Sequence, residues 1–168
     1  MDPQYEHIKG FIPQDEADGM FTQLLESIPW EVAKWKTGKP LPRMVCPISD
    51  SGLDEHPVFV KLRQLIYDRF KVRIRGIWGN LYRDNNDFCP EHQDSYGGYV
   101  FTFCFGQERE LIFRKLSKNA KGGYDRTKLL TQHGDLYYFS QKMDADHKHS
   151  VPKSTANNGQ RISIVMFA

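Results

Sequence analysis

Near residue 71, the hydrophobic pattern of the chain changes from a helical period to a period of two. Apolar residues then recur at every second position, which is the spacing of a half-buried β-strand. In 99–105, four aromatic residues alternate with Val, Thr and Cys, so the four rings would share one face of a strand. Comparable runs lie at 72–78, 109–113, 128–131, 136–139 and 161–167. Turn-forming Gly, Asn and Asp residues separate the runs, and the pattern predicts a β-rich core.

The part before this change contains two amphipathic segments, 15–27 and 57–70. In both, apolar residues follow the i, i+3, i+4 spacing of a helix with one buried face. Two helices followed by many short strands predict an α+β fold, with a double-stranded β-helix (jelly-roll) core and two N-terminal buttressing helices. With 168 residues we expect one domain, 1–168, in which 1–70 supplies the helical buttress and 71–168 the jelly-roll core.

Composition excludes several classes of protein. Three cysteines without a CxxC pair argue against a disulfide framework and a cysteine zinc site. No signal peptide or long apolar run is present, so we expect a cytoplasmic or nuclear protein with no membrane partner. A net charge of +2 is too small for binding to nucleic acid by charge alone. The basic stretches 61–75 and 107–128 fit solvated faces or a polyanion-facing surface equally well.

The segment His92-Gln93-Asp94 contains an H-x-D pair. In an extended chain, residues i and i+2 point the same way, so the imidazole and the carboxylate can hold one ion. A second histidine that could bind the same ion lies later in the chain, at His147 or His149. Two histidines and one carboxylate on a β scaffold form the facial triad that binds non-haem Fe(II) and leaves coordination positions open. A buried Arg161 nearby would suit a dicarboxylate cosubstrate.

Several motifs occur in a fixed order along the chain. Together they resemble the AlkB family of Fe(II)/2-oxoglutarate dioxygenases, over about Phe11 to Phe167. The segments that carry this resemblance are Asn80-Leu81-Tyr82, His92-Gln93-Asp94, Phe105-Gly106 with 109–114, His133-Gly134-Asp135-Leu136, His149-Ser150-Val151-Pro152 and Arg161-Ile162-Ser163. The ordered set is far more specific than any one of its parts.

The resemblance assigns roles to individual residues. It implies that His92, Asp94 and His149 are the catalytic iron ligands, with His149 preferred to His147 because Ser-Val-Pro follows it. Arg161 would bind the distal carboxylate of 2-oxoglutarate, and O₂ would be the second cosubstrate. The remaining cosubstrate-binding residues would be Asn80, Tyr82 and Ser163. The implied reaction is oxidative demethylation of N-alkylated bases, such as 1-methyladenine or 3-methylcytosine, in DNA or RNA.

The chain departs from the family pattern at three places. Ser163 stands where Asn is usual, and Phe167 replaces a second Arg that helps to bind the near carboxylate of the cosubstrate. Ser95 and Tyr96 follow the H-x-D pair, where repair members have acidic residues. These departures leave room for a hydroxylase of a protein side chain or small molecule, or for a catalytically degenerate binding module. The cations that could replace the second Arg are Arg109, Arg114 and Lys142.

Base recognition calls for aromatic stacking surfaces. Our candidates for contact with the substrate are Tyr96 and Trp78, followed by Tyr99, Trp35 and Phe59. The family places a substrate-covering lid before the barrel, and the Pro- and Gly-containing segment 36–52 is the candidate here. Its short length predicts a preference for single strands over duplexes. We expect a monomer.

Overall fold

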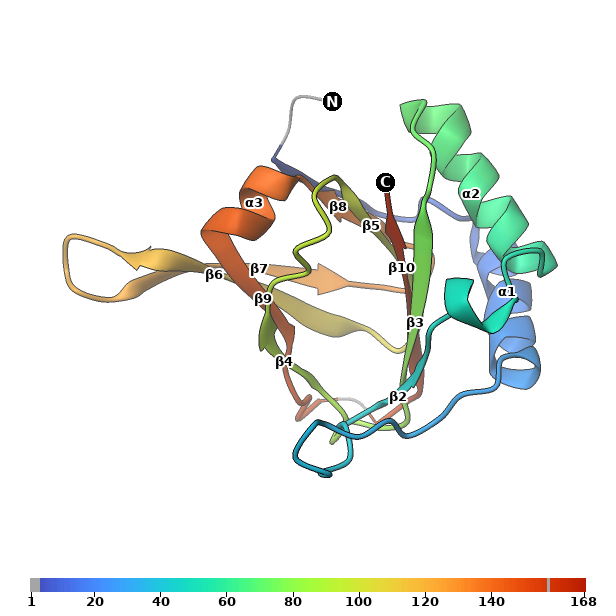
Figure 1. Ribbon diagram of the computed structural model, residues 1–168, viewed down its shortest axis with the longest axis horizontal. Coiled ribbons are helices and arrows are strands. Elements are labelled where there is room, and N and C mark those ends of the chain that lie inside the picture. The colour runs from blue at the N-terminus through green and yellow to red at the C-terminus, as the bar shows by residue number, and fades with distance from the viewer. Residues whose placement is uncertain (1–3, 157) are drawn as a thin grey trace.

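Two antiparallel sheets face each other across a shared interior, and two helices cover the outer face of the larger sheet (Figure 1). The computed structural model describes residues 4–156 and 158–168. The helices are α1 (Gln14–Ser27), α2 (Pro57–Phe70) and the short α3 (Gln141–Asp146), with a 3-10 turn at Ser49–Ser51. The strands are β1 (Tyr5–Ile8), β2 (Met44–Cys46), β3 (Gly76–Tyr82), β4 (Cys89–His92), β5 (Val100–Gly106), β6 (Arg109–Lys118), β7 (Tyr124–Thr131), β8 (Leu136–Phe139), β9 (His147–Val151) and β10 (Arg161–Phe167).

The larger sheet has the order β1-β8-β5-β10-β3-β2, and the smaller has the order β4-β9-β6-β7. Strands that are far apart in the sequence therefore lie side by side, as in the pairing of β10 with β3 from Arg161↔Tyr82 to Phe167↔Gly76. The edge strands β1 and β2 of the larger sheet come from the first 70 residues. The division into a buttress and a core at residue 70 stays a prediction. No helix in the described residues is long and apolar enough to cross a membrane.

Both predicted helices are confirmed, to within one residue at the start of α1. On α1 the buried residues Ala17, Met20 and Leu24 face the larger sheet. The side chain of His56 caps the start of α2 by accepting a hydrogen bond from the backbone N–H of Val58. The two helices thus bury the apolar faces that their spacing predicts.

The central strand β5 separates two apolar layers, as the period of two predicts. Phe101, Phe103 and Phe105 are fully buried in the layer between the sheet and the helices. Val100 and Cys104 point the other way, into the layer between the two sheets. This second layer surrounds the interior in which the candidate site lies.

Two of the expected elements need correction. The strand expected at 72–78 lies four residues later, at Gly76–Tyr82, and 72–75 form no strand. The segment 36–52, expected to be a loop, contains strand β2 and a 3-10 turn. Backbone hydrogen bonds join β2 to β3 in register, so this part of the candidate lid belongs to the sheet.

Candidate metal centre

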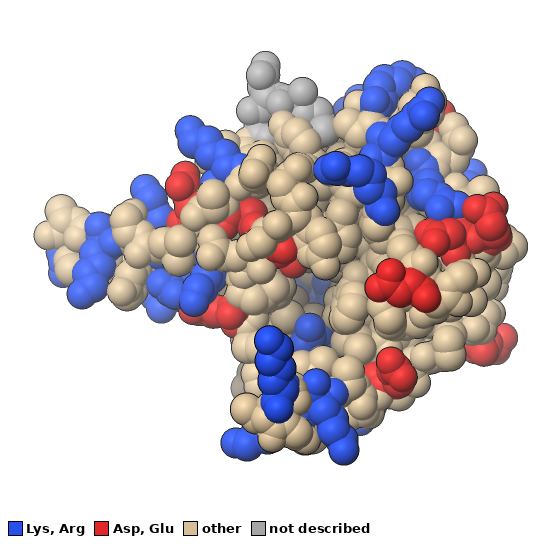
Figure 2. Space-filling model, viewed as in Figure 1, with Lys and Arg blue, Asp and Glu red and all other residues tan. Residues whose placement is uncertain are grey.

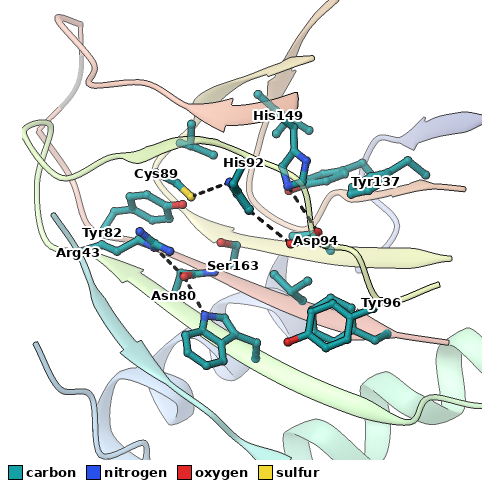
Figure 3. Close-up of a pocket in the computed structure, with 17 residues that line it drawn as sticks. Arg43, Asn80, Tyr82, Cys89, His92, Asp94, Tyr96, Tyr137, His149 and Ser163 are labelled. Carbon is teal, nitrogen blue, oxygen red and sulfur yellow. Dashed lines mark hydrogen bonds and ion pairs between the residues drawn. The ribbon is translucent and has the colours of Figure 1, made fainter. Parts of the chain in front are cut away.

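The H-x-D pair and His149 meet because their strands pair. His92 ends β4 and lies directly opposite His149 on β9, so the ring centroids are 4.2 Å apart. The Asp94 carboxylate lies between the rings, with Oδ1 3.3 Å from His92 Nε2 and Oδ2 3.4 Å from His149 Nε2 (Figure 3). The candidate ligand atoms all lie within 4.8 Å of one another. His147 lies outside this cluster, with its Nδ1 3.1 Å from the carbonyl oxygen of Met143.

The ring nitrogens are arranged as a metal requires. His92 Nδ1 is 2.9 Å from the carbonyl oxygen of Pro90, which can only accept, so Nδ1 carries the proton and Nε2 is left for a ligand bond. His149 is buried, and its Nδ1 has no hydrogen-bond partner in the described part of the chain. Two imidazole nitrogens and one carboxylate form the donor set that suits Fe(II) with open positions. The residues present therefore fit the metal that the family resemblance implies.

The three groups differ in charge. Burial disfavours the charged form of His92, but hydrogen bonds with Asp94 and Cys89 outweigh it and raise the pKa of His92 to about 10. Burial also disfavours the charged form of the Asp94 carboxylate, yet its hydrogen bond with His92 and its electrostatic interactions with the two imidazoles lower its pKa. Burial lowers the pKa of His149 to about 4. A proton therefore sits between His92 and Asp94 at neutral pH, where a bound cation would replace it.

A cavity of about 220 Å³ opens beside the three candidate ligands. Pockets for drug-sized ligands are typically ~300–1,000 Å³, so this cavity suits a small molecule such as a short organic acid. Its apolar wall includes Leu111, Phe139 and Val151. Its other lining residues include Arg43, Trp78, Asn80, Tyr82, Tyr96 and Ser163.

Polar side chains of β3 and β10 form one wall of the cavity. Asn80 and Ser163 are register partners across the two strands, and both line the cavity. The Oδ1 atom of Asn80 accepts from Trp78 Nε1 (3.1 Å) and from Arg43 Nε (2.8 Å), which leaves its amide N–H groups to donate. Burial raises the pKa of Tyr82 above its usual value, so its phenol keeps its proton.

Arg161 lies behind the cavity rather than at its wall. It is 1% exposed, and its Nη2 donates to Thr131 Oγ1 at 2.9 Å and lies 3.2 Å from Cys104 Sγ. Its Nε atom has no partner, and no carboxylate pairs with it among the residues that the structure describes. A buried guanidinium without a counter-charge is costly, so this position fits an anionic ligand.

None of the three cations suggested by the sequence lines the cavity. Arg109 donates to the carbonyl oxygens of Asp87 and Pro152, both at 2.6 Å, and Arg114 pairs with Glu91 outside the cavity. Lys142 is exposed on α3. Sequence reasoning missed Arg43, which does line the cavity. Its Nη1 atom is buried and has no hydrogen-bond partner within residues 4–156 and 158–168. No motif marks Arg43, and only the pairing of β2 with β3 brings it to the site.

The aromatic candidates separate into two groups. Tyr96 and Trp78 line the cavity, and the Tyr96 ring stacks on Phe167 with centroids 3.9 Å apart and planes inclined by 26°. Phe167, which stands where a second Arg was expected, therefore makes an aromatic contact with Tyr96. The other three candidates do not line the cavity: Phe59 is buried on α2 in the core between the helices and the larger sheet, Tyr99 packs against that same core, and Trp35 is exposed elsewhere.

Comparisons with known proteins agree with this geometry. No family model matches the chain. It is 26% identical to alpha-ketoglutarate-dependent dioxygenase alkB homolog 3 of Bos taurus over 92% of the chain, and 25% identical to that of Homo sapiens. Identity to the DNA oxidative demethylase ALKBH2 of Arabidopsis thaliana is 24%, over 94% of the chain. The chain spans 62% of the length of the two alkB homolog 3 proteins and 64% of ALKBH2, less than two thirds of each.

Solved structures share the fold at low sequence identity. OsALKBH1 matches with a TM-score of 0.60 and 12% identity, covering 100% of this chain and 99% of that one. A 2OG-Fe(II) oxygenase family oxidoreductase from Burkholderia pseudomallei matches with 0.58 and 16%, over 98% and 83% of the two chains. The non-haem alpha-ketoglutarate-dependent epimerase SnoN matches with 0.56 and 14%, over 98% and 79%. These likenesses confirm the predicted jelly-roll fold, and the sequence matches confirm the resemblance of the chain to the AlkB family.

Proposed function

We propose that this chain is an Fe(II)- and 2-oxoglutarate-dependent dioxygenase that removes N-methyl groups from bases of DNA or RNA. The observation that carries the proposal is the register pairing of His92 with His149, which brings two imidazole nitrogens and the Asp94 carboxylate to one cavity. The names of the curated relatives, which include a DNA oxidative demethylase, support the same reaction. The expected substrates are bases of the 1-methyladenine and 3-methylcytosine type.

In this proposal each group of the site has a defined task. His92, Asp94 and His149 would hold Fe(II). Tyr82 at the cavity wall would bind one carboxylate of 2-oxoglutarate, and the buried Arg161 guanidinium behind the wall would supply the positive charge. Bound Fe(II) supplies the oxidation in which O₂ places one oxygen atom in succinate, formed with CO₂ from 2-oxoglutarate, and the other in the N-methyl group as N–CH₂OH. That product loses formaldehyde and leaves N–H. The apolar wall of the cavity would limit the access of water, and the stacked Tyr96 and Phe167 offer an aromatic surface to a base.

The charge distribution supports a polyanionic partner. The β6–β7 hairpin projects from the body of the molecule, and Lys and Arg side chains lie along it (Figures 1 and 2). Figure 2 also shows Lys and Arg around the hollowed centre of the same face. The projecting part carries Lys115, Lys118, Lys121 and Arg126, all exposed. At the base of the hairpin Phe113 is the register partner of His149, so phosphates bound at that end would lie near the cavity.

Product release tests this function directly. Purified protein is supplied with Fe(II), 2-oxoglutarate and oligonucleotides that carry 1-methyladenine or 3-methylcytosine, and succinate and formaldehyde are measured. We expect both products only with methylated oligonucleotide, and none with the Asp94→Ala variant. Equal succinate with and without oligonucleotide would point to a protein side chain or a small molecule as the substrate. No succinate under any condition would favour a degenerate binding module.

Strand preference is a separate prediction, because the candidate lid is short. Turnover is expected to be faster on a single strand than on the matched duplex, because an unpaired base enters the cavity without the cost of leaving a base stack. Equal rates on the two substrates would contradict it. A monomeric state and a cytoplasmic or nuclear location stay predictions.

We further propose that Arg43 serves as the second cation for 2-oxoglutarate, in place of the Arg replaced by Phe167. Its buried Nη1, which no described residue pairs with, and its bond to Asn80 support this role. Arg43→Gln is expected to raise the KM for 2-oxoglutarate by roughly 10- to 100-fold, because a hydrogen bond to a charged group contributes about 1.5–3 kcal/mol. Arg114→Gln, which changes an arginine paired with Glu91 outside the cavity, is the matched control. An unchanged KM in Arg43→Gln would contradict the assignment.

A further inference from the structure

A buried carboxylate lies next to the candidate metal centre and has no part in the proposed chemistry. Asp144 is on α3 and is 7% exposed. The short helix is fixed at its start by Ser140, whose side chain accepts from the backbone N–H of Met143. Acidic side chains are seldom buried without a partner, so the contacts of Asp144 are informative.

On one side, Asp144 binds the backbone of the H-x-D segment. Its Oδ1 accepts from the backbone N–H of Asp94 (3.0 Å), and its Oδ2 accepts from that of Ser95 (2.9 Å). Gln93 adds a bond from its side chain to the carbonyl oxygen of Asp144 (2.6 Å). Ser95 has φ 57°, a left-handed conformation that residues other than glycine seldom adopt. The segment therefore turns sharply just after Asp94, and α3 holds it there.

On the other side, Asp144 faces the second histidine of the cluster. Its Oδ1 is 3.8 Å from His149 Nδ1, which is buried and has no hydrogen-bond partner among the residues that the structure describes. A histidine that binds metal through Nε2 carries its proton on Nδ1 and normally donates it to a carboxylate or a carbonyl. A side-chain movement of roughly 1 Å would bring the two atoms to hydrogen-bond distance.

We propose that Asp144 is a positioning residue that holds two metal ligands at once, Asp94 through its backbone and His149 through Nδ1. This inference rests on the metal site of the proposed function. It explains why a carboxylate is buried at this point of α3. It also gives Asp94 and His149, which come from distant parts of the chain, one common support.

The test is metal binding rather than turnover. Apo protein is titrated with Co(II) in the absence of oxygen, and the d–d absorption bands report both affinity and coordination geometry. Asp144→Asn is expected to bind Co(II) roughly 10- to 100-fold more weakly than wild type, with altered bands, because loss of an outer partner of a metal ligand has effects of this size. The matched control is Asp146→Asn, which changes an exposed acid on the same helix and should bind as wild type does. Circular dichroism checks that both variants are folded.

The outcomes separate this inference from the function on which it rests. Wild-type protein that binds no Co(II) would overturn the proposed metal site itself. Wild-type affinity and unchanged bands in Asp144→Asn would overturn only the role of Asp144. If the variant does not fold, the NMR signal of His149 Nδ1–H in Zn(II)-loaded wild type decides. Protection of the His149 Nδ1 proton from exchange with solvent, as expected if it is donated to the Asp144 carboxylate, supports the proposal. Free exchange of this proton with solvent overturns it.

Discussion

His149→Ala is expected to abolish metal binding and succinate formation together, whereas His147→Ala keeps both. His149 Nε2 lies 3.4 Å from the Asp94 carboxylate and inside the three-residue cluster, while His147 lies outside it. Removing a ligand should weaken metal binding by more than the ~10–100-fold that loss of an outer partner causes. Anaerobic Fe(II) titration and succinate release measure the two effects.

The two histidines make a sharp comparison because they lie two residues apart on the same strand. His147 contacts the carbonyl oxygen of Met143, so its replacement by alanine perturbs the end of α3 but leaves the cluster complete. Circular dichroism of both variants shows whether each keeps its fold. The opposite result, with iron lost in His147→Ala and kept in His149→Ala, would make His147 the ligand and would show that the register of β4 with β9 differs from His92↔His149.

Local pattern was enough to predict the elements that bury large apolar faces. The alternation in β5 and the helical spacing in α1 and α2 follow from side-chain burial, which acts on neighbouring residues of one element. The strand β3 was placed too early because Val72 and Ile74 alternate like strand residues, yet they pack against the helix-side core ahead of the sheet. The sheet instead takes in Gly79, where an added Cβ would lie 2.9 Å from the Trp30 ring. Glycine is disfavoured inside strands, so the place of Gly79 in β3 depends on its packing against Trp30, which is distant in the sequence.

The candidate site shows the same limit. The H-x-D spacing itself suggests an ion site, but β4 and β9 are short and polar, and nothing in their pattern tells which residues pair. The choice of His149 came from the family resemblance. Arg43 and Asp144 were missed because no motif marks them, and each reaches the site only through a long-range pairing: β2 with β3, and α3 with the H-x-D segment.

Phe103→Ala is expected to lower the free energy of unfolding by about 3–5 kcal/mol, which is typical for deleting a fully buried phenylalanine. Phe103 is 0% exposed in the middle of β5, in the layer that joins the larger sheet to α1 and α2. Urea unfolding followed by circular dichroism measures the change, with the exposed Val60→Ala on α2 as a control within about 1 kcal/mol of wild type. The opposite face of β5 carries Thr102 to the cavity wall, so the variant should also bind Co(II) more weakly as the sheet loosens. A loss of stability below about 1 kcal/mol would contradict the tight packing of Phe103 in that layer.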